Sequence, residues 1–473
     1  MAPADRQTHD LVVVANRLPV DKVSTADGEV EWRPSPGGLV TAMEPVMKDH
    51  GGAWVGWTGE AGGDEDLEPF EAGDMWLVPV ALSATDIEDH YEGFANDTLW
   101  PIYHDVIVPA RFRRRWYDGY RRVNHRFAEM AASVAAPNAT VWVHDYQLQL
   151  VPAILRTLRP DVRIGWFNHI PFPPVELFAQ IPWRREIVEG LLGADLLGFQ
   201  RAADAQNFLR VVRRLLHLHI KGDYVSVQMP GEHTHREVRA GTFPISVDAE
   251  GMEALARRPD VKERSRQIRA DLGNPKHLLL GIDRLDYTKG IRHRLKAYQE
   301  LLSDGAIAPP DTVLVQVATP SRERVDAYRE LRDQVEVTVG RINGEEGRIG
   351  SPAVHYLHHS YPREEMAALY LAGDVMLVTP VRDGMNLVAK EYVAARYDDG
   401  GALVLSEFTG AAEDLHRAFL CNPHDISGLK AAIVAALRAE PRDARRRMRA
   451  MRRQVFRHDV HRWARDYLDA LSE

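Results

Sequence analysis

Four charged residues in the second half of the chain have the types and spacing expected of a site for a sugar linked to a diphosphate. Arg284 and Lys289 lie five residues apart in one stretch, and Asp383 and Glu391 flank another. Two cations can neutralise a diphosphate leaving group through charge-assisted hydrogen bonds, without a metal ion. Carboxylates can accept hydrogen bonds from sugar hydroxyls. Either cation alone would fit a surface salt bridge, so the prediction depends on both occurring together.

A strand, a turn and a helix are expected to position the two carboxylates. Residues 375–380 are continuously apolar, as in a parallel strand covered on both faces. A tight turn at residues 382–384 follows, and a helical pattern then runs from about Met385 to Tyr397. Ligands bind at the carboxyl ends of parallel strands, and the first amides of a helix attract an anion. Such units are also common as plain structure, so this one does not establish a site by itself.

The rest of the chain repeats the pattern of an apolar strand that ends in polar residues. Arg17, Asp145 and His169 follow strands in the first half, and Arg322 follows one in the second half. Gly37 and Gly38 precede a helical pattern; they fit a close approach to a phosphate and a flexible turn equally well. Alternating strands and helices in two series predict an α/β fold with two Rossmann-like, doubly wound domains.

A break in this alternation sets the expected domain boundaries. The stretch around Pro244 and Ile245 reads as a linker, so we expect one domain over residues 1–246 and another over 247–455. Residues 456–473 carry large apolar side chains at helical spacing. We expect this helix to pack back on the first domain.

Composition and short motifs exclude several classes of protein. The chain has 473 residues, 45% of them hydrophobic and 27% charged, and a net charge of −9, which gives no reason to bind nucleic acid or an anionic membrane. Arg111–Trp116 is therefore read as a solvated helix face. The single Cys421, the lack of a signal-peptide pattern at the start and the lack of a membrane-length apolar run indicate a cytoplasmic protein.

Candidate metal ligands occur without the surroundings that a metal site needs. Asp64 and Asp66 lie in an acidic, glycine-rich stretch with no preceding strand, and the histidine pairs at 217/219 and 233/235 lack further ligands at zinc spacing. No metal ion or other cofactor is therefore expected. Two Rossmann-like domains fit a nicotinamide dehydrogenase or a glycosyltransferase of the GT-B type. The chain has no G-x-G-x-x-G, which argues against the dehydrogenase.

Nine stretches, in chain order, resemble the trehalose-6-phosphate synthases from about Leu11 to the final helix. They are VVVANRLP, GGLV, WPIYHD, VHDYQL, HIPFP, DLLGFQ, DRLDYTKG, RINGEEG and TPVRDGMNLVAKEYVAA. The resemblance implies a GT-B fold with two domains facing across a cleft. It also implies a retaining enzyme that moves glucose from a nucleotide-glucose to glucose 6-phosphate and forms an α,α-1,1 linkage. UDP- and ADP-glucose are the expected donors, with GDP-glucose left open.

The same resemblance implies roles for individual residues. The donor would be held by Gly37, Gly38, Arg284, Lys289, Tyr361, Met385, Asn386, Leu387, Val388, Ala389, Lys390 and Glu391. The acceptor would be held by Arg17, Tyr91, Trp100, Asp145 and Arg322, and Trp100 and Ile170 would select its anomer. The catalytic residues would be Arg284, Lys289, Asp383 and His169. Asp383 would hold hydroxyls of the transferred glucose, Glu391 would hold the ribose, and His169 would contact the donor sugar.

No carboxylate in these motifs is a convincing nucleophile, because Asp145 and Asp383 both have a more natural role in binding hydroxyls. We therefore expect front-face transfer, in which a donor phosphate oxygen takes the proton of the incoming hydroxyl. Two alternatives stay open: a related enzyme with another phosphorylated acceptor, and a non-catalytic homologue that binds a sugar phosphate. A dimer or tetramer is expected.

Overall fold

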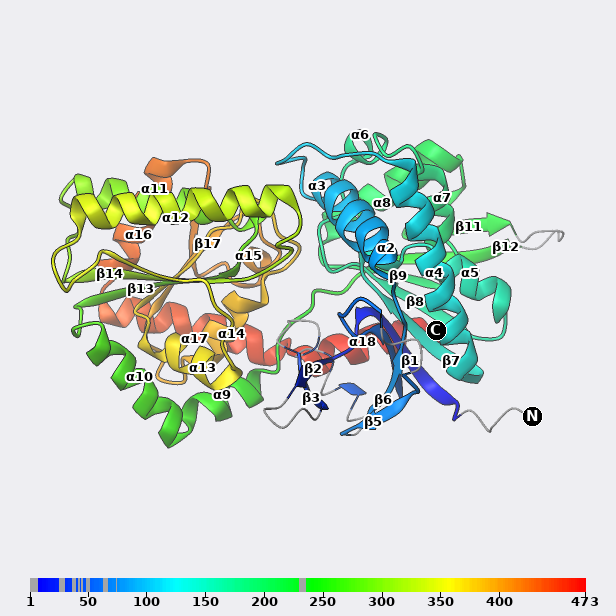
Figure 1. Ribbon diagram of the computed structural model, residues 1–473, viewed down its shortest axis with the longest axis horizontal. Helices are drawn as coiled ribbons and strands as arrows, with labels where there is room; N and C mark the ends of the chain where they lie inside the picture. Colours follow the sequence, from blue (N-terminus) through cyan, green and yellow to red (C-terminus); the bar gives the residue numbers. More distant parts are fainter. Residues whose placement is uncertain are drawn as a thin grey trace. The chain divides into compact units, whose positions relative to one another are not determined.

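The computed structural model describes residues 7–24, 30–35, 40, 43, 46–47, 52–62, 67–73, 75–228 and 235–473 (Figure 1). The chain forms two compact units. Unit 1 comprises Met1–Pro244 and His461–Glu473, and unit 2 comprises Ile245–Val460. The sequence placed these breaks after residues 246 and 455. In the described part of the chain no helix is long and apolar enough to cross a membrane.

Unit 1 is built on a ten-stranded sheet in the order β10-β11-β12-β9-β8-β7-β1-β4-β6-β5. The strands from β12 to β6 run parallel, and antiparallel strands close both edges. Their bounds are β1 His9–Arg17, β4 Ala53–Trp57, β5 Phe70–Ala72, β6 Met75–Pro79, β7 Ala135–His144, β8 Arg163–Phe167, β9 Leu196–Phe199, β10 Ile220–Lys221, β11 Tyr224–Gln228 and β12 His235–Thr242; β2 Val20–Ser24 and β3 Val30–Pro34 form a separate hairpin. The chain order of the strands reverses between β1 and β7, so ligands are expected at that point.

The helices of unit 1 include one that the sequence pattern did not indicate. Residues Ile87–Leu99 form a π-helix, which is rare and often found at functional sites. Others in the described part of unit 1 are α2 Ala84–Asp86, α3 Trp100–Tyr103, α4 Arg114–Val134, α5 Val151–Leu158, α6 Val175–Phe178, α7 Arg184–Leu191, α8 Ala202–Leu216 and α18 Val460–Ser472, with a short 3-10 turn at Tyr146–Leu148. The final helix α18 stacks Tyr467 on Trp142, with ring centroids 4.5 Å apart. A Cβ at Gly165 or Gly198 would come within 2.6 Å of the Tyr467 side chain, so these glycines admit the helix to the sheet.

Unit 2 has six parallel strands in the order β15-β14-β13-β16-β17-β18, which is the Rossmann order. The strands are β13 His277–Arg284, β14 Thr312–Thr319, β15 Val354–Leu357, β16 Val375–Val378, β17 Ala402–Ser406 and β18 Phe419–Cys421. The helices are α9 Ala249–Arg257, α10 Pro259–Asp271, α11 Ile291–Ser303, α12 Asp326–Glu346, α13 Arg363–Ala372, α14 Leu387–Ala395, α15 Ala411–Asp414, α16 Ile426–Leu437 and α17 Pro441–Arg457, with a 3-10 turn at Tyr287–Lys289. Helices α11, α12 and α16 cover one face of the sheet, and α10, α13, α14 and α17 cover the other (Figure 1). The expectation of an α/β fold with two Rossmann-like parts is confirmed.

Candidate active site

In unit 2 the predicted catalytic residues Lys289 and Asp383 form an ion pair. The Lys289 Nζ lies 2.6 Å from the Asp383 Oδ2, and the two side chains are only 12% and 13% exposed. Lys289 comes from the loop after β13, and Asp383 comes from the loop after β16. These strands are neighbours at the point where the chain order of the sheet reverses, which is where ligands bind in sheets of this kind.

Two glycines allow the loops of this site to approach one another. Gly290 has a φ of +64°, and a Cβ there would lie 2.0 Å from the Thr379 carbonyl oxygen. A Cβ at Gly410 would lie 2.1 Å from the Gly384 carbonyl oxygen. No side chain can be accommodated at such distances. The loops after β13, β16 and β17 therefore depend on glycine for their contact.

Helix α14 begins two residues later than the sequence pattern suggested, because Asn386 is its N-cap. The Asn386 Oδ1 accepts the Ala389 N–H at 3.0 Å, and the Asn386 Nδ2 donates to the Asp383 Oδ2 at 3.1 Å. The cap residue has φ 88° and ψ 89°, a left-handed conformation that is uncommon outside glycine and is characteristic of functional sites. Since the cap uses the amide of Ala389, that amide is not open to a ligand.

The two charged residues that end the Met385–Glu391 segment face different partners. The Tyr370 hydroxyl donates to the Glu391 Oε2 at 2.7 Å; burial raises the pKa of Glu391, and this hydrogen bond opposes the increase. The Lys390 ammonium donates to the Ile245 carbonyl at 2.9 Å and to the Asp414 Oδ2 at 2.6 Å. Burial lowers the pKa of Lys390, and Asp414 opposes that change. Any contact of Lys390 with a donor is therefore left to its backbone.

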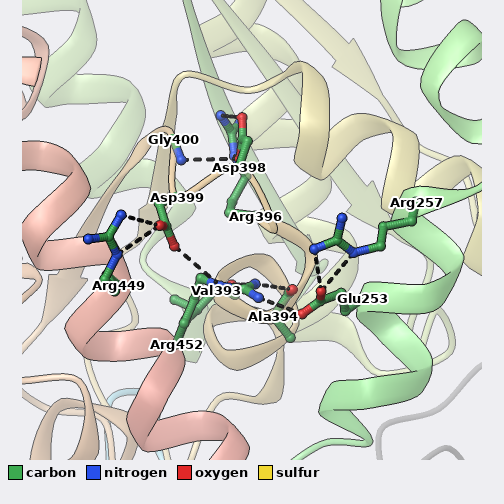
Figure 2. A network of polar contacts seen from close by, with 10 residues as sticks. All are labelled: Glu253, Arg257, Val393, Ala394, Arg396, Asp398, Asp399, Gly400, Arg449 and Arg452. Carbon is green, nitrogen blue, oxygen red and sulfur yellow. Dashed lines mark hydrogen bonds and ion pairs between the residues drawn. The ribbon is translucent and has the colours of Figure 1, made fainter.

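The carboxyl end of α14 is held by an arginine of α17, as Figure 2 shows. The Arg452 Nη1 donates to the Ala394 carbonyl at 2.6 Å and to the Val393 carbonyl at 3.3 Å. The Arg452 Nη2 also pairs with Glu253 of α9. A cation near the carboxyl end of a helix satisfies open carbonyls and the helix dipole. Helix α14 is therefore fixed at both ends.

The carboxylate of Asp286 interacts electrostatically with the predicted phosphate-binding cations of unit 2. The Arg322 Nη1 lies 3.2 Å from the Asp286 Oδ2, and the Arg322 side chain is only 4% exposed. Burial acts to raise the pKa of Asp286, but Arg322, Arg284 and Lys289 outweigh it and hold that pKa below its usual value. Arg322 also has a φ of 50°. The sequence analysis did not single out Asp286, although it lies inside the stretch DRLDYTKG.

In unit 1 the predicted acceptor residues Arg17 and Tyr91 meet on one tryptophan. The Arg17 Cζ lies 5.2 Å from the centroid of the Trp57 ring, and the Tyr91 ring packs edge-on against Trp57 at 5.8 Å. Arg17 ends β1 and also pairs with Asp21 at 2.7 Å. Tyr91 comes from the π-helix. The sequence pattern did not single out Trp57 as a site residue.

Asp145, His169 and His144 form a second group in unit 1. The Asp145 Oδ1 accepts the backbone N–H of His169 at 3.2 Å, and the His144 Nδ1 lies 3.0 Å from the His169 Nε2. Asp145 has φ 74° and ψ 172°, a region otherwise populated almost entirely by glycine. The Trp100 ring packs on Tyr146 at 5.5 Å, beside Asp145, and Ile170 is buried next to His169. Asp145 and His169, two of the residues expected to bind sugar, are thus brought together.

The model of "Glycosyltransferase family 20" matches residues 9–473. The chain belongs to this family. It is 58% identical over 474 residues to the trehalose-6-phosphate synthase of Mycolicibacterium gilvum, covering 98% of this chain and 93% of that protein. A crystal structure of an alpha,alpha-trehalose-phosphate synthase (UDP-forming) from Burkholderia xenovorans, in complex with glucose-6-phosphate, has a TM-score of 0.89 and 34% identity, covering 98% of this chain and all of that one. A structure from E. coli bound with UDP-2-fluoro glucose has a TM-score of 0.88 and 33% identity, covering 98% of this chain and 99% of that one.

For some residues predicted for this family-20 chain, no contact with either group is described. Gly37 and Gly38 lie outside the described residues, as do Asp64, Asp66 and His233. The Tyr361 ring lies before α13 and packs against His359 with ring centroids 4.8 Å apart. Their predicted roles, like those of the other site residues, stay predictions. Among the described residues, no group of three or more histidine, cysteine or acidic side chains is arranged to hold a metal ion.

Proposed function

We propose that this family-20 glycosyltransferase moves glucose from a nucleotide-glucose to glucose 6-phosphate, with retention, and forms α,α-trehalose 6-phosphate. The observation that carries the proposal is the partly buried Lys289–Asp383 pair at the switch point of the Rossmann sheet of unit 2. It joins a cation for the diphosphate to a carboxylate for the transferred sugar. The ligands of two similar structures, glucose-6-phosphate and UDP-2-fluoro glucose, support the two substrates.

On the donor side, Lys289 and Arg284 neutralise the diphosphate as it leaves. Both contribute to the positive field that lowers the pKa of Asp286, so their charges act on one region of unit 2. Cations held in fixed positions stabilise the developing negative charge of a transition state without reorganising. Asp383 accepts hydroxyls of the transferred glucose, and Glu391 accepts those of the ribose through the oxygen that Tyr370 leaves open. The positive charge that this chemistry needs comes from side chains, so we propose that it requires no metal ion.

On the acceptor side, Arg17 and Tyr91 bind the phosphate of glucose 6-phosphate, and Asp145 binds its hydroxyls. The Trp57 ring holds the first two side chains next to each other. A guanidinium presents several donors to a phosphate dianion, and a phenol adds one more. Arg322 is the further phosphate ligand predicted from the sequence.

Both candidate nucleophiles already have hydrogen-bond donors. Asp383 accepts from Lys289 and Asn386, and Asp145 accepts from the backbone of His169. This supports front-face transfer. The bond between the sugar C1 and the phosphate oxygen breaks, and the acceptor hydroxyl adds to C1 on the same face. Its proton passes to an oxygen of the departing nucleoside diphosphate.

The test is release of nucleoside diphosphate from UDP-, ADP- and GDP-glucose, with and without glucose 6-phosphate. We expect release that depends on the acceptor, with a non-reducing disaccharide phosphate as product; the preferred donor identifies the nucleotide. Release that is independent of the acceptor would indicate hydrolysis instead. Binding of glucose 6-phosphate without release from any donor would indicate a non-catalytic homologue. A cytoplasmic location and a dimeric or tetrameric state belong to the same proposal, and sedimentation of the purified chain measures the latter.

A further inference from the structure

His169 has a buried histidine as its side-chain partner. His144 is the last residue of β7, and His169 follows the neighbouring strand β8. The His144 Nδ1 lies 3.0 Å from the His169 Nε2, and the two rings stack with an interplanar angle of 26°. Aromatic rings of Trp142, Phe167 and Trp463 pack around the pair. Two imidazole nitrogens at this distance must share one hydrogen.

Neither ring carries a charge near neutral pH. Burial lowers the pKa of His144 well below its ordinary value, with a further decrease from His169. Burial also lowers the pKa of His169 to about 3. Burial is the main cause of both changes, and the only nearby carboxylate described, that of Asp145, accepts the backbone N–H of His169 rather than a ring N–H. Each ring therefore has one N–H and one bare nitrogen, and the hydrogen between them belongs to one ring.

The surroundings of the two ring nitrogens that lie outside this contact, His144 Nε2 and His169 Nδ1, decide which ring donates. The His144 Nε2 is enclosed and has no hydrogen-bond partner among the described residues. A hydrogen on it would be an enclosed, unpaired N–H, and such groups are rare in folded proteins. The hydrogen of His144 is therefore on Nδ1, which donates to the His169 Nε2. That leaves the hydrogen of His169 on its own Nδ1, which is not one of the enclosed, unpaired atoms.

We propose that His144 is a positioning residue that fixes the tautomer of His169, so that the His169 Nδ1–H is presented to a hydroxyl of the bound sugar. The proposal rests on the function proposed above and on the contact between His169 and the donor sugar that the resemblance to the family implies. The hydrogen bond that one ring nitrogen makes sets the state of the other nitrogen. The backbone of His169 is fixed separately, by Asp145. In this state His169 donates a hydrogen bond and takes no proton, which leaves the proton of the acceptor to the phosphate.

Amide side chains distinguish this role from simple packing. The asparagine amide nitrogen occupies the place of a histidine Nδ1, whereas the glutamine amide nitrogen reaches the place of Nε2. His169→Asn therefore keeps a donor where the proposal needs one, and His169→Gln does not. We expect His169→Asn to retain at least about tenfold more kcat/KM than His169→Gln.

A double-mutant cycle tests the link between the two histidines. We expect His144→Leu to lower kcat/KM for the donor by about 10- to 100-fold, and His144→Asn, which keeps a donor near Nδ1, to recover activity to within about threefold of the original protein. Asparagine has no tautomers, so His144→Leu should change activity by less than about twofold in a His169→Asn background. An equal loss in both backgrounds would show that His144 is merely structural.

The nitrogen chemical shifts of His169 provide a test that needs neither turnover nor a stable variant. With 15N-labelled histidine, the protein should show a protonated Nδ1 and a bare Nε2 for His169 at neutral pH. Observation of the Nε2–H tautomer would overturn the proposal. Failure of the proposed function would appear differently, as a lack of nucleoside diphosphate release by the unmodified protein, while the shifts could still be read.

Discussion

In unit 2 the predicted site residues Lys289 and Arg322 are each paired with an aspartate, whereas in unit 1 several predicted site residues contact aromatic rings. Lys289 is matched by Asp383, and Arg322 is matched by Asp286. In unit 1, Arg17 and Tyr91 contact Trp57, and His169 contacts the neutral ring of His144. Removing one member of a buried ion pair leaves the other charge uncompensated, which is costly. Removing a ring changes packing and the response to pH instead.

Loss of the Lys289 charge should have the largest effect of the substitutions considered. We expect Lys289→Met to lower kcat/KM for the donor by about 10²- to 10³-fold, because the variant loses a fixed positive charge at the leaving group. Lys430→Met is the matched control, since Lys430 also pairs with an aspartate at 2.6 Å in unit 2 but lies on α16. We expect the control to stay within about twofold, because surface pairs contribute little. Similar losses in both variants would break the link between the ion pair and catalysis.

Arg452 tests whether charge also stabilises the helix that carries the donor residues. We expect Arg452→Met to reduce the free energy of unfolding of unit 2 by about 2–3 kcal/mol, since it removes hydrogen bonds to the end of α14 and leaves Glu253 without that cation. The control is Arg449→Met on the same helix, which also pairs with Asp399 but is 64% exposed. We expect about 0.5 kcal/mol or less there. Urea denaturation followed by circular dichroism measures both, and equal effects would contradict the proposed role of Arg452.

The sequence predicted the parts of the fold and site that depend on local patterns. Apolar runs and polar strand ends gave the two alternating series of strands and helices, and therefore the edge of each sheet where site residues lie. Lys289 and Asp383 could be placed together because both follow parallel strands. The helix expected over residues 456–473 begins only at Val460, after a break at His458 and Asp459 that follows α17.

Contacts between distant segments could not be predicted in the same way. Tyr370 and Glu391 lie on different helices, and nothing in the spacing of α13 indicates that its tyrosine faces a carboxylate. The helix at Ile87–Leu99 has π geometry, which a pattern of 3.6 residues per turn does not reveal. The helical pattern runs from about Met385, but the side chain of Asn386 caps the helix, which therefore begins at Leu387. The sequence pattern does not single out Asp286, because its contact with Arg322 forms only when the chain folds.

Acid sensitivity should distinguish the two kinds of region. His90 is fully buried in unit 1, with its Nε2 3.2 Å from the Asn16 Oδ1, and burial lowers its pKa to about 3. Between pH 6.5 and 3 the unfolded chain binds a proton at this residue and the folded chain does not. The free energy of unfolding should therefore fall by about 1.4 kcal/mol per pH unit as the pH is lowered through this range. The pKa of Asp286 is lowered instead, so its contribution is complete above the usual carboxyl range and unchanged between pH 5 and 7.

His90→Gln isolates this effect, since its amide nitrogen can still donate to Asn16. Below pH 6.5, the slope of the unfolding free energy of unit 1 against pH should be smaller in the variant by about 1.4 kcal/mol per pH unit. Urea denaturation at pH 7, 6 and 5 measures the slope. His125→Gln, at an exposed position of α4, controls for the substitution itself. An unchanged slope in His90→Gln would mean that this buried ring is not a source of acid sensitivity.

Tyr370 differs from the charged residues of unit 2, because it is a neutral group that positions the carboxylate of Glu391. Tyr370→Phe removes one hydrogen bond, worth about 1 kcal/mol, without leaving an unpaired cation. We expect KM for the donor to rise about fivefold while kcat changes by less than about twofold, since the ribose is bound equally in the ground and transition states. Tyr392→Phe is the control, because the hydroxyl of Tyr392 lies 3.5 Å from its nearest acceptor, a weak contact. A fall in kcat at constant KM would instead place Glu391 in the chemical step.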